Sequence, residues 1–155
     1  MKIMDFLSKK SILAELRSSR KEDVIKEMVE LLINAGEIEK SCRAKVFDAL
    51  MERESLGSTA IGQGIAIPHA KTDCVAKLVA AFALSKKGVD FDSLDGEPVH
   101  IFFLLLAAQD SAGPHLKALA RISRLFKDKF FRDNLRNAAD EKQIIQVIAS
   151  EDEKV

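Results

Sequence analysis

The segment Gly62-Gln63-Gly64-Ile65-Ala66-Ile67-Pro68-His69-Ala70 places one histidine directly after a proline and among small residues. Pro68 fixes its own φ and pushes the residue before it toward extended geometry. We therefore interpret residues 65–67 as the end of a buried strand, with His69 at its rim. An imidazole held in a fixed direction suits proton transfer, metal binding or nucleophilic attack on phosphorus.

Two further histidines have different settings. His115 follows Pro114, which suits the first position of a helix, so we expect His115 in the first helical turn. The positive end of the helix would lower the pKa of this imidazole, and the neutral ring could donate a hydrogen bond to a phosphoryl oxygen. His100 opens a predicted strand and has no such setting, so we interpret it as a structural or surface residue.

The segment Arg53-Glu54-Ser55-Leu56-Gly57-Ser58-Thr59 is a second candidate for anion binding. The guanidinium of Arg53 matches phosphate geometry, and a glycine-containing loop with Ser58 and Thr59 can supply N–H and O–H donors. A pair of turn-capping hydroxyls beside a solvated arginine explains the same residues. The residue types alone leave both interpretations open.

Other chemistries lack their residue patterns. The chain has no HExxH motif, no carboxylate cluster at metal-ligand spacing, no Walker loop and no GxSxG elbow, and Gly62-Gln63-Gly64 lacks the third glycine of a dinucleotide fingerprint. We expect no metal and no cofactor. Because 24 basic residues balance 24 acidic ones, nucleic acid is disfavoured as a partner.

The elements that must position these residues follow from hydrophobic spacing. At 155 residues we expect one domain, and helices on both sides of a strand-rich centre predict a layered α/β fold. A cap by Ser19, a stop at Gly36 and a cap by Asp140 mark helix ends. The predicted helices are 21–35, 41–54, 114–126, 130–135 and 140–148, and the predicted strands are 78–85, 89–91 and 99–108.

Cysteine usage and hydropathy bear on the compartment. Cys42 and Cys74 form neither a zinc signature nor a disulfide framework, so we expect buried thiols in a reducing cytosol. Residues 1–11 do not resemble a signal peptide, and the longest apolar run, 101–108, is too short to cross a bilayer. We expect a cytoplasmic protein without direct membrane insertion.

Taken together, the motifs resemble the enzyme IIA domains of the fructose–mannitol class (type 2) of the bacterial phosphoenolpyruvate-dependent phosphotransferase system. The resemblance runs from Ile3 to about Ile148 and implies a single domain, 1–155, with a central mixed β-sheet flanked by helices. One departure is Ala70, where many members have glycine. The segments that carry the resemblance are Arg53-Glu54, Leu56, Ser58-Thr59, Ile61-Gly62, 64–69, Asp90-Phe91, Asp95-Gly96, Pro98-Val99 and His115-Leu116.

The resemblance implies a role for each site residue. His69 would be phosphorylated at Nε2 by the phosphohistidine of HPr or of its nitrogen-branch paralogue, without a metal, and His115 and Arg53 would assist. A sugar-specific enzyme IIA would pass the phosphoryl group to a cysteine of a IIB domain, whereas a regulatory one would hold it and change its partners. The phosphate-binding residues would be Ser58, Thr59, Gly64 and Pro68.

Within the family, the chain looks most like the nitrogen-regulatory type. It carries no membrane segment and no attached IIB or HPr-like region, and its helix beginning at His115-Leu116-Lys117-Ala118 favours the same subclass. A sugar-specific enzyme IIA on a separate chain is the close alternative. A partner-binding module in which His69 is a relic is the alternative from another class. A metal site of His69 and His115 lacks a further ligand at suitable spacing.

Overall fold

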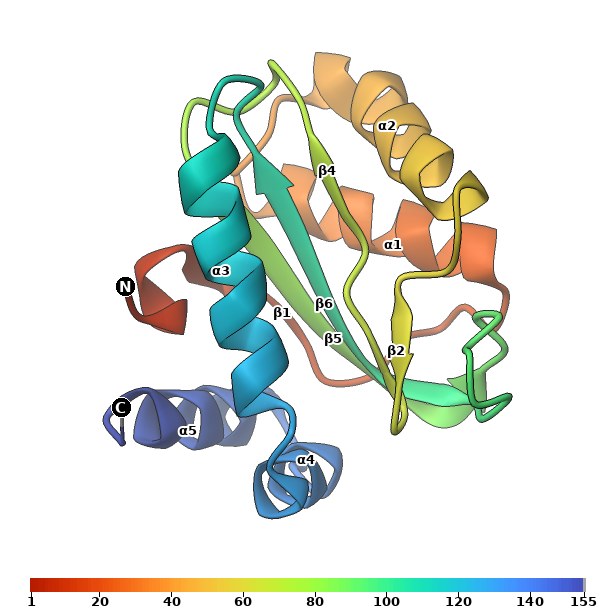
Figure 1. Cartoon of the computed structure of the whole chain (residues 1–155), viewed down its shortest axis with the longest axis vertical. Coiled ribbons are helices and arrows are strands. Elements are labelled where there is room, and N and C mark those ends of the chain that lie inside the picture. The colour runs from red at the N-terminus through yellow and green to blue at the C-terminus, as the bar shows by residue number, and fades with distance from the viewer. Residues whose placement is uncertain (155) are drawn as a thin grey trace.

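A six-stranded mixed sheet lies at the centre of the protein, whose computed structural model describes residues 1–154 (Figure 1). The strands follow the order β1-β5-β6-β3-β2, and β4 also pairs with β6. The β5–β6 and β2–β3 pairs are antiparallel, whereas β1–β5, β3–β6 and β4–β6 are parallel. The strands are β1 Leu7–Leu13, β2 Ala60–Gly62, β3 Ile65–Ala66, β4 His69–Lys71, β5 Val79–Val89 and β6 Val99–Ala107.

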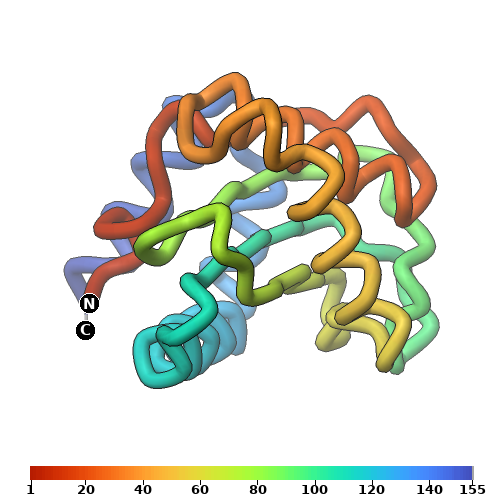
Figure 2. Tube along the Cα trace, turned by 90° about the horizontal axis from the view of Figure 1, so that it is seen from above, coloured from red at the N-terminus to blue at the C-terminus, as the bar shows by residue number. Residues whose placement is uncertain are grey.

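Helices cover both faces of this sheet. Because side chains alternate along a strand, Phe102 and Leu104 of β6 pack on one face with α1 and α2, while Phe103 and Leu105 pack on the other with α3, α4 and α5. Figure 2 shows the three layers from above. The layered α/β fold with a mixed central sheet is therefore confirmed. The helices are α1 Lys21–Asn34, α2 Arg43–Ser55, α3 Ala112–Leu125, α4 Lys129–Arg136 and α5 Glu141–Asp152, with 3-10 turns η1 Ile3–Asp5 and η2 Lys40–Cys42.

The extended path of β3 is interrupted at Pro68 and resumes in the same register as β4. Ile65 is opposite Ile101 and His69 is opposite Leu105, so the register against β6 is the same on both sides of Pro68. Pro68 has no N–H to donate, but its carbonyl accepts the Leu105 N–H at 2.9 Å. The predicted strand does end before His69, since β3 ends at Ala66, but the extended path resumes after Pro68 as β4. His69 therefore begins a second strand instead of lying at the rim of the first, because proline removes one N–H donor without ending the extended path.

The helix ends agree with the sequence in part. Gly36, with a φ of 77°, follows the end of α1 as expected, and the carboxylate of Asp140 accepts the Gln143 N–H at the start of α5. Ser19 was wrongly predicted as a cap, since the N-cap of α1 is Arg20 and no side chain caps it. Helix α3 begins at Ala112, before the predicted proline start, because a helix does not need the N–H groups of its first turn.

The central strands also differ from the prediction. The predicted strand 89–91 is not a separate element, because β5 runs without a break to Val89. Strands β1 and β2 had no counterpart in the sequence analysis. No helix among residues 1–154 is both long enough and apolar enough to span a membrane.

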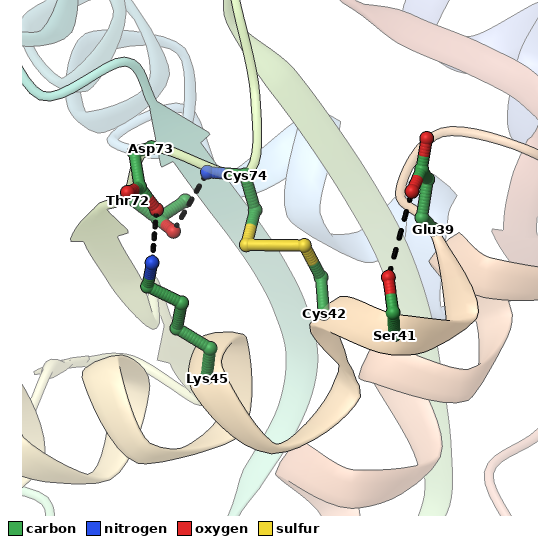
Figure 3. The surroundings of a disulfide bond; sticks show 7 residues. All are labelled: Glu39, Ser41, Cys42, Lys45, Thr72, Asp73 and Cys74. Carbon is green, nitrogen blue, oxygen red and sulfur yellow. Dashed lines mark hydrogen bonds and ion pairs between the residues drawn. A yellow bond between two sulfur atoms is a disulfide. The ribbon is translucent and has the colours of Figure 1, made fainter.

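The two cysteines form a disulfide bond, so the prediction of two separate thiols was wrong (Figure 3). Cys42 lies at the start of α2 and Cys74 lies in the loop after β4, 32 residues further on, with 6.2 Å between their Cα atoms. Both side chains are half-buried. Sequence spacing cannot reveal this pair, because only the packing of α2 beside β4 brings the cysteines together.

We predict that Phe103→Ala lowers the free energy of unfolding by about 3–5 kcal/mol. The Phe103 ring is 2% exposed and meets Phe6, Phe82 and Phe126 edge to face, so its removal leaves a cavity. Urea unfolding followed by circular dichroism measures the loss. The matched control is Phe130→Ala, whose ring is 68% exposed and whose removal should change stability by less than about 0.5 kcal/mol. Equal losses in the two variants would contradict this account of the core.

Candidate active site

The ring of His69 is oriented by its own backbone. Nδ1 lies 2.8 Å from the carbonyl oxygen of Ile67, and a carbonyl only accepts, so Nδ1 carries the proton. The other ring nitrogen, Nε2, then carries the lone pair. The extended backbone around Pro68 brings the Ile67 carbonyl to this position, so the sequence around the histidine selects both the ring direction and the tautomer.

Strand alternation directs His69 toward α3. Ile65 and Ile67 pack on the face of the sheet covered by α3, and His69 continues the same alternation. On that face its ring meets the ring of His115, with 5.5 Å between the ring centroids and an interplanar angle of 85°. His115 lies in the first turn of α3, as the sequence predicts. In Figure 1, β4 lies between α3 and α2, so the end of each helix can contribute to one site.

His115 is almost fully buried. Its side chain is 6% exposed, and neither ring nitrogen has a hydrogen-bond partner within residues 1–154. Burial lowers the pKa of His115, and the charges of His69 and Lys71 lower it further. The direction is the one expected from the sequence, but the main cause is desolvation rather than the helix end. A neutral imidazole here has one N–H free to donate.

The pKa of His69 is also lowered, and the largest cause is again burial. The hydrogen bond to the Ile67 carbonyl opposes this shift because it favours the protonated ring, whereas the positive charge of Arg53 adds to the shift and the negative charge of Glu54 opposes it. Both imidazoles are therefore neutral near pH 7. A neutral ring nitrogen beside a guanidinium is a competent nucleophile in an electropositive setting.

Arg53 reaches the site from the last turn of α2. Its side chain is half-buried, and Nη1 donates to the Gly57 carbonyl at 2.8 Å. The chain then turns back toward the sheet, where the Ile67 N–H donates to the Thr59 carbonyl at 3.0 Å. Among the described residues β4 pairs with β6 alone, so its outer edge is left free beside the end of α2.

The hydroxyls of Ser58 and Thr59 have partners inside the protein. Ser58 donates to the Phe91 carbonyl at 2.6 Å, and Thr59 donates to the Glu54 carboxylate through both its hydroxyl and its N–H. Glu54 is 6% exposed and also pairs with Lys21 at 2.8 Å. These contacts hold the loop between α2 and β2 against the sheet.

The sequence analysis gave no role to two charged residues of the site. Glu54 lies four residues after the buried Leu50, and this helical spacing could have identified it as a buried carboxylate. Lys71 lies two residues after His69 on the same face of β4, and its charge reaches His115. Lys71 therefore places a second cation near the two rings.

Of the predicted phosphate-binding residues, Pro68 lies next to His69, whereas Gly64 lies far from it. Pro68 directly precedes His69 and shares its strand path. Gly64 lies in the β2–β3 turn, where its carbonyl accepts the N–H groups of His100 and Ile101. At roughly 3.3 Å per extended residue, Gly64 is about 16 Å along the strand from His69. The structure does not bring Gly64 to the site.

His69 and His115 have no third side chain suited to a metal ion. Within residues 1–154, no group of three or more His, Cys, Asp or Glu side chains is placed to hold one. The groups present are an oriented neutral nucleophile, a buried neutral donor and two cations. This set is suited to metal-independent transfer of an anionic group.

The chain belongs to the EIIA 2 family of the phosphoenolpyruvate-dependent sugar phosphotransferase system, whose family model matches residues 5–151. It is therefore a component of a system that transfers phosphoryl groups between proteins. The fold agrees with this membership, since the structure resembles the crystal structure of nitrogen regulatory protein IIA-Ntr from Neisseria meningitidis with a TM-score of 0.85. That likeness has 31% sequence identity and covers 94% of this chain and 98% of the other.

Curated relatives include both regulatory and sugar-specific proteins. A nitrogen regulatory protein of Bradyrhizobium diazoefficiens is 40% identical over 149 residues, which cover 96% of this chain and 95% of the relative. The fructose-specific EIIABC component of Bacillus subtilis is 43% identical over 152 residues, which cover 98% of this chain. The chain spans only 24% of the length of that second relative.

We predict that the rings of His69 and His115 both titrate with midpoints below pH 6.5. Burial favours the neutral form of each ring, so the unfolded chain binds more protons than the folded one just below pH 6.5. Stability should consequently fall as the pH drops from 6.5 toward the lowered pKa values. Ring nitrogen chemical shifts recorded by NMR as a function of pH measure the two midpoints. A midpoint at or above 6.5 for either ring would contradict the prediction.

Proposed function

We propose that this protein is a phosphohistidine carrier that accepts a phosphoryl group on Nε2 of His69 from HPr or its nitrogen-branch paralogue. The observation that carries the proposal is the Nδ1 contact with the Ile67 carbonyl, which leaves Nε2 unprotonated beside the buried ring of His115. Family membership supports the same assignment, since enzyme IIA components take part in phosphoryl transfer.

In the proposed step, the Nε2 lone pair of His69 attacks the phosphorus of the donor phosphohistidine. The new N–P bond forms while the donor N–P bond breaks, and the donor imidazole leaves with its electron pair. Positive charge that develops on the His69 ring is stabilised by the Ile67 carbonyl, which accepts the Nδ1 proton's hydrogen bond. Transfer between two imidazoles is nearly balanced in energy, so positioning and charge stabilisation are sufficient.

The phosphoryl oxygens need donors and positive charge. We assign this role to Arg53, to Lys71 and to one N–H of His115, whose ring nitrogens are otherwise unpaired within the described chain. Pro68 would act by fixing the strand. Ser58 and Thr59 remain predicted phosphate ligands, although their hydroxyls would have to exchange the Phe91 and Glu54 partners for the phosphate.

We propose the nitrogen-regulatory role for this single 1–155 domain, acting in the cytoplasm on a regulatory target. The relative of that name matches along nearly all of both chains. A sugar-specific role is the second candidate, because the fructose-specific relative has the higher identity. Transfer of the phosphoryl group from His69 to a cysteine of a fructose-type IIB domain would favour the sugar role, and a stable phosphoprotein in its presence would favour regulation.

We predict that His69→Ala abolishes phosphorylation. With enzyme I, HPr and phosphoenolpyruvate, the unaltered chain should gain one acid-labile phosphate, which intact-protein mass spectrometry detects. The matched control is His100→Ala, which removes an imidazole that contacts the Ser85 carbonyl on another part of the sheet and should leave phosphorylation intact. Phosphate on the His69→Ala chain, or none on the unaltered chain, would refute the carrier proposal.

We predict that Arg53→Ala slows phosphoryl transfer to His69 by at least about tenfold, which corresponds to roughly 1.4 kcal/mol of transition-state stabilisation. The guanidinium is the cation of α2 whose charge acts on the His69 ring, and its removal leaves developing phosphoryl charge less well balanced. Rapid-quench kinetics with phosphorylated HPr measure the rate. Arg43→Ala, at the opposite end of the same helix and paired with Glu30, serves as control and should keep the original rate. Equal rates for the two variants would remove Arg53 from the site.

A further inference from the structure

The disulfide joins the two elements that carry the proposed site. Cys42 directly precedes α2, which holds Arg53 in its last turn, and Cys74 follows β4, whose first residue is His69. The covalent loop from 42 to 74 therefore encloses both residues. Of the groups assigned to the phosphoryl site, His115 is the one outside this loop.

The contacts near the bridge are of unequal strength. On the side of Cys74, the Thr72 N–H donates to the Ala107 carbonyl of β6 at 2.9 Å, and the Thr72 hydroxyl accepts the Cys74 N–H (Figure 3). This side is anchored to the sheet. Within the part of the chain that the structure describes, an ion pair between Lys45 and Asp73 also links this loop to α2, and both of its side chains are 61% exposed. An ion pair with such exposed side chains contributes little to stability. The disulfide is therefore a stronger link between the loop after β4 and α2 than this ion pair.

The bridge is accessible to thiol exchange. Both cysteine side chains are half-buried rather than enclosed in the core. Cys42 ends the 3-10 turn η2 and is the N-cap residue of α2, although its side chain makes no capping hydrogen bond. A thiolate from outside the protein can therefore open the bridge by attack on one of its two sulfur atoms.

We propose that Cys42–Cys74 is a reversible redox modification site, and that the closed bridge speeds phosphoryl transfer by fixing the position of α2 relative to β4. The inference rests on the proposed function of His69 and Arg53. In a compartment that keeps thiols reduced, such a bridge is a transient switch rather than a permanent support. The opened chain keeps its fold but loses the covalent constraint on the spacing between the guanidinium and the nucleophile.

The redox step balances with a dithiol as reductant. One thiolate of the dithiol attacks the Cys74 sulfur, the protein S–S bond breaks, and Cys42 leaves as a thiolate that takes up a proton. The second thiol of the reductant then displaces Cys74 from the mixed disulfide. The protein gains two electrons and two protons, and the dithiol becomes a cyclic disulfide. Disulfide oxidants reverse the sequence.

The test compares the oxidised and the dithiothreitol-reduced full-length chain, freed of reductant under anaerobic conditions, as acceptors from phosphorylated HPr. Alkylation and mass spectrometry report the thiol state of each sample, and circular dichroism reports its fold. We expect transfer to the reduced chain to be about tenfold slower, since a misplacement of about 1 Å costs up to roughly a hundredfold. The His69 ring signals in NMR should also differ between the two states.

The double variant Cys42→Ser/Cys74→Ser is the matched control. With or without dithiothreitol treatment, it should accept phosphate at the slower rate expected for the dithiothreitol-reduced chain. This result distinguishes loss of the bridge from an effect of dithiothreitol on HPr. Equal or faster transfer to the reduced chain, with phosphate still on His69, would overturn the proposed role of the bridge and leave the carrier proposal standing. Absence of phosphate from His69 in both the oxidised and the reduced chain would instead refute the carrier proposal, and with it the proposed role of the bridge. Unchanged NMR signals of the His69 ring on reduction of the disulfide would also overturn the proposed role of the bridge.

Discussion

The hydrogen bond from Nδ1 of His69 to the carbonyl of Ile67 is the constraint on which the site depends. It joins a side chain to the backbone two residues earlier, so it forms only where the chain is extended across Pro68. Pairing of His69 with Leu105 of β6 keeps that extension in place. One short segment therefore determines the tautomer and direction of the nucleophile, and the sheet makes it rigid.

The electrostatics of the site combine burial with charge at its margin. Desolvation keeps the imidazoles of His69 and His115 neutral, and Arg53 and Lys71 bring positive charge close to them. A neutral pair of rings avoids the cost of two buried positive charges and leaves a free lone pair. Within residues 1–154, neither Arg53 nor Lys71 forms an ion pair, and the nearby Glu54 is paired with Lys21. In the proposed transfer, an incoming phosphoryl group would therefore meet positive charge from Arg53 and Lys71.

The same site depends on contacts between distant parts of the chain. Among residues 1–154 the sheet neighbour of β4 is β6, and β4 lies between α2 and α3 (Figure 1). The Cys42–Cys74 bond then links α2 to the loop after β4. Small changes in how α2 sits on the sheet would thus alter the position of Arg53 but not the local geometry of His69. In the proposed function, the rate of transfer could then change while the His69 ring keeps its orientation.

Local sequence determined the orientation of the proposed nucleophile His69, the main helices and the apolar strands β5 and β6, because proline geometry, helix caps and hydrophobic spacing act over a few residues. Short or partly polar strands such as β1 and β4 escaped prediction, since their pairing partners lie far along the chain. The meeting of His69 with His115, the burial of Glu54 and the disulfide were decided by tertiary structure. These features share one physical reason, because each depends on how the helices and the sheet pack against one another.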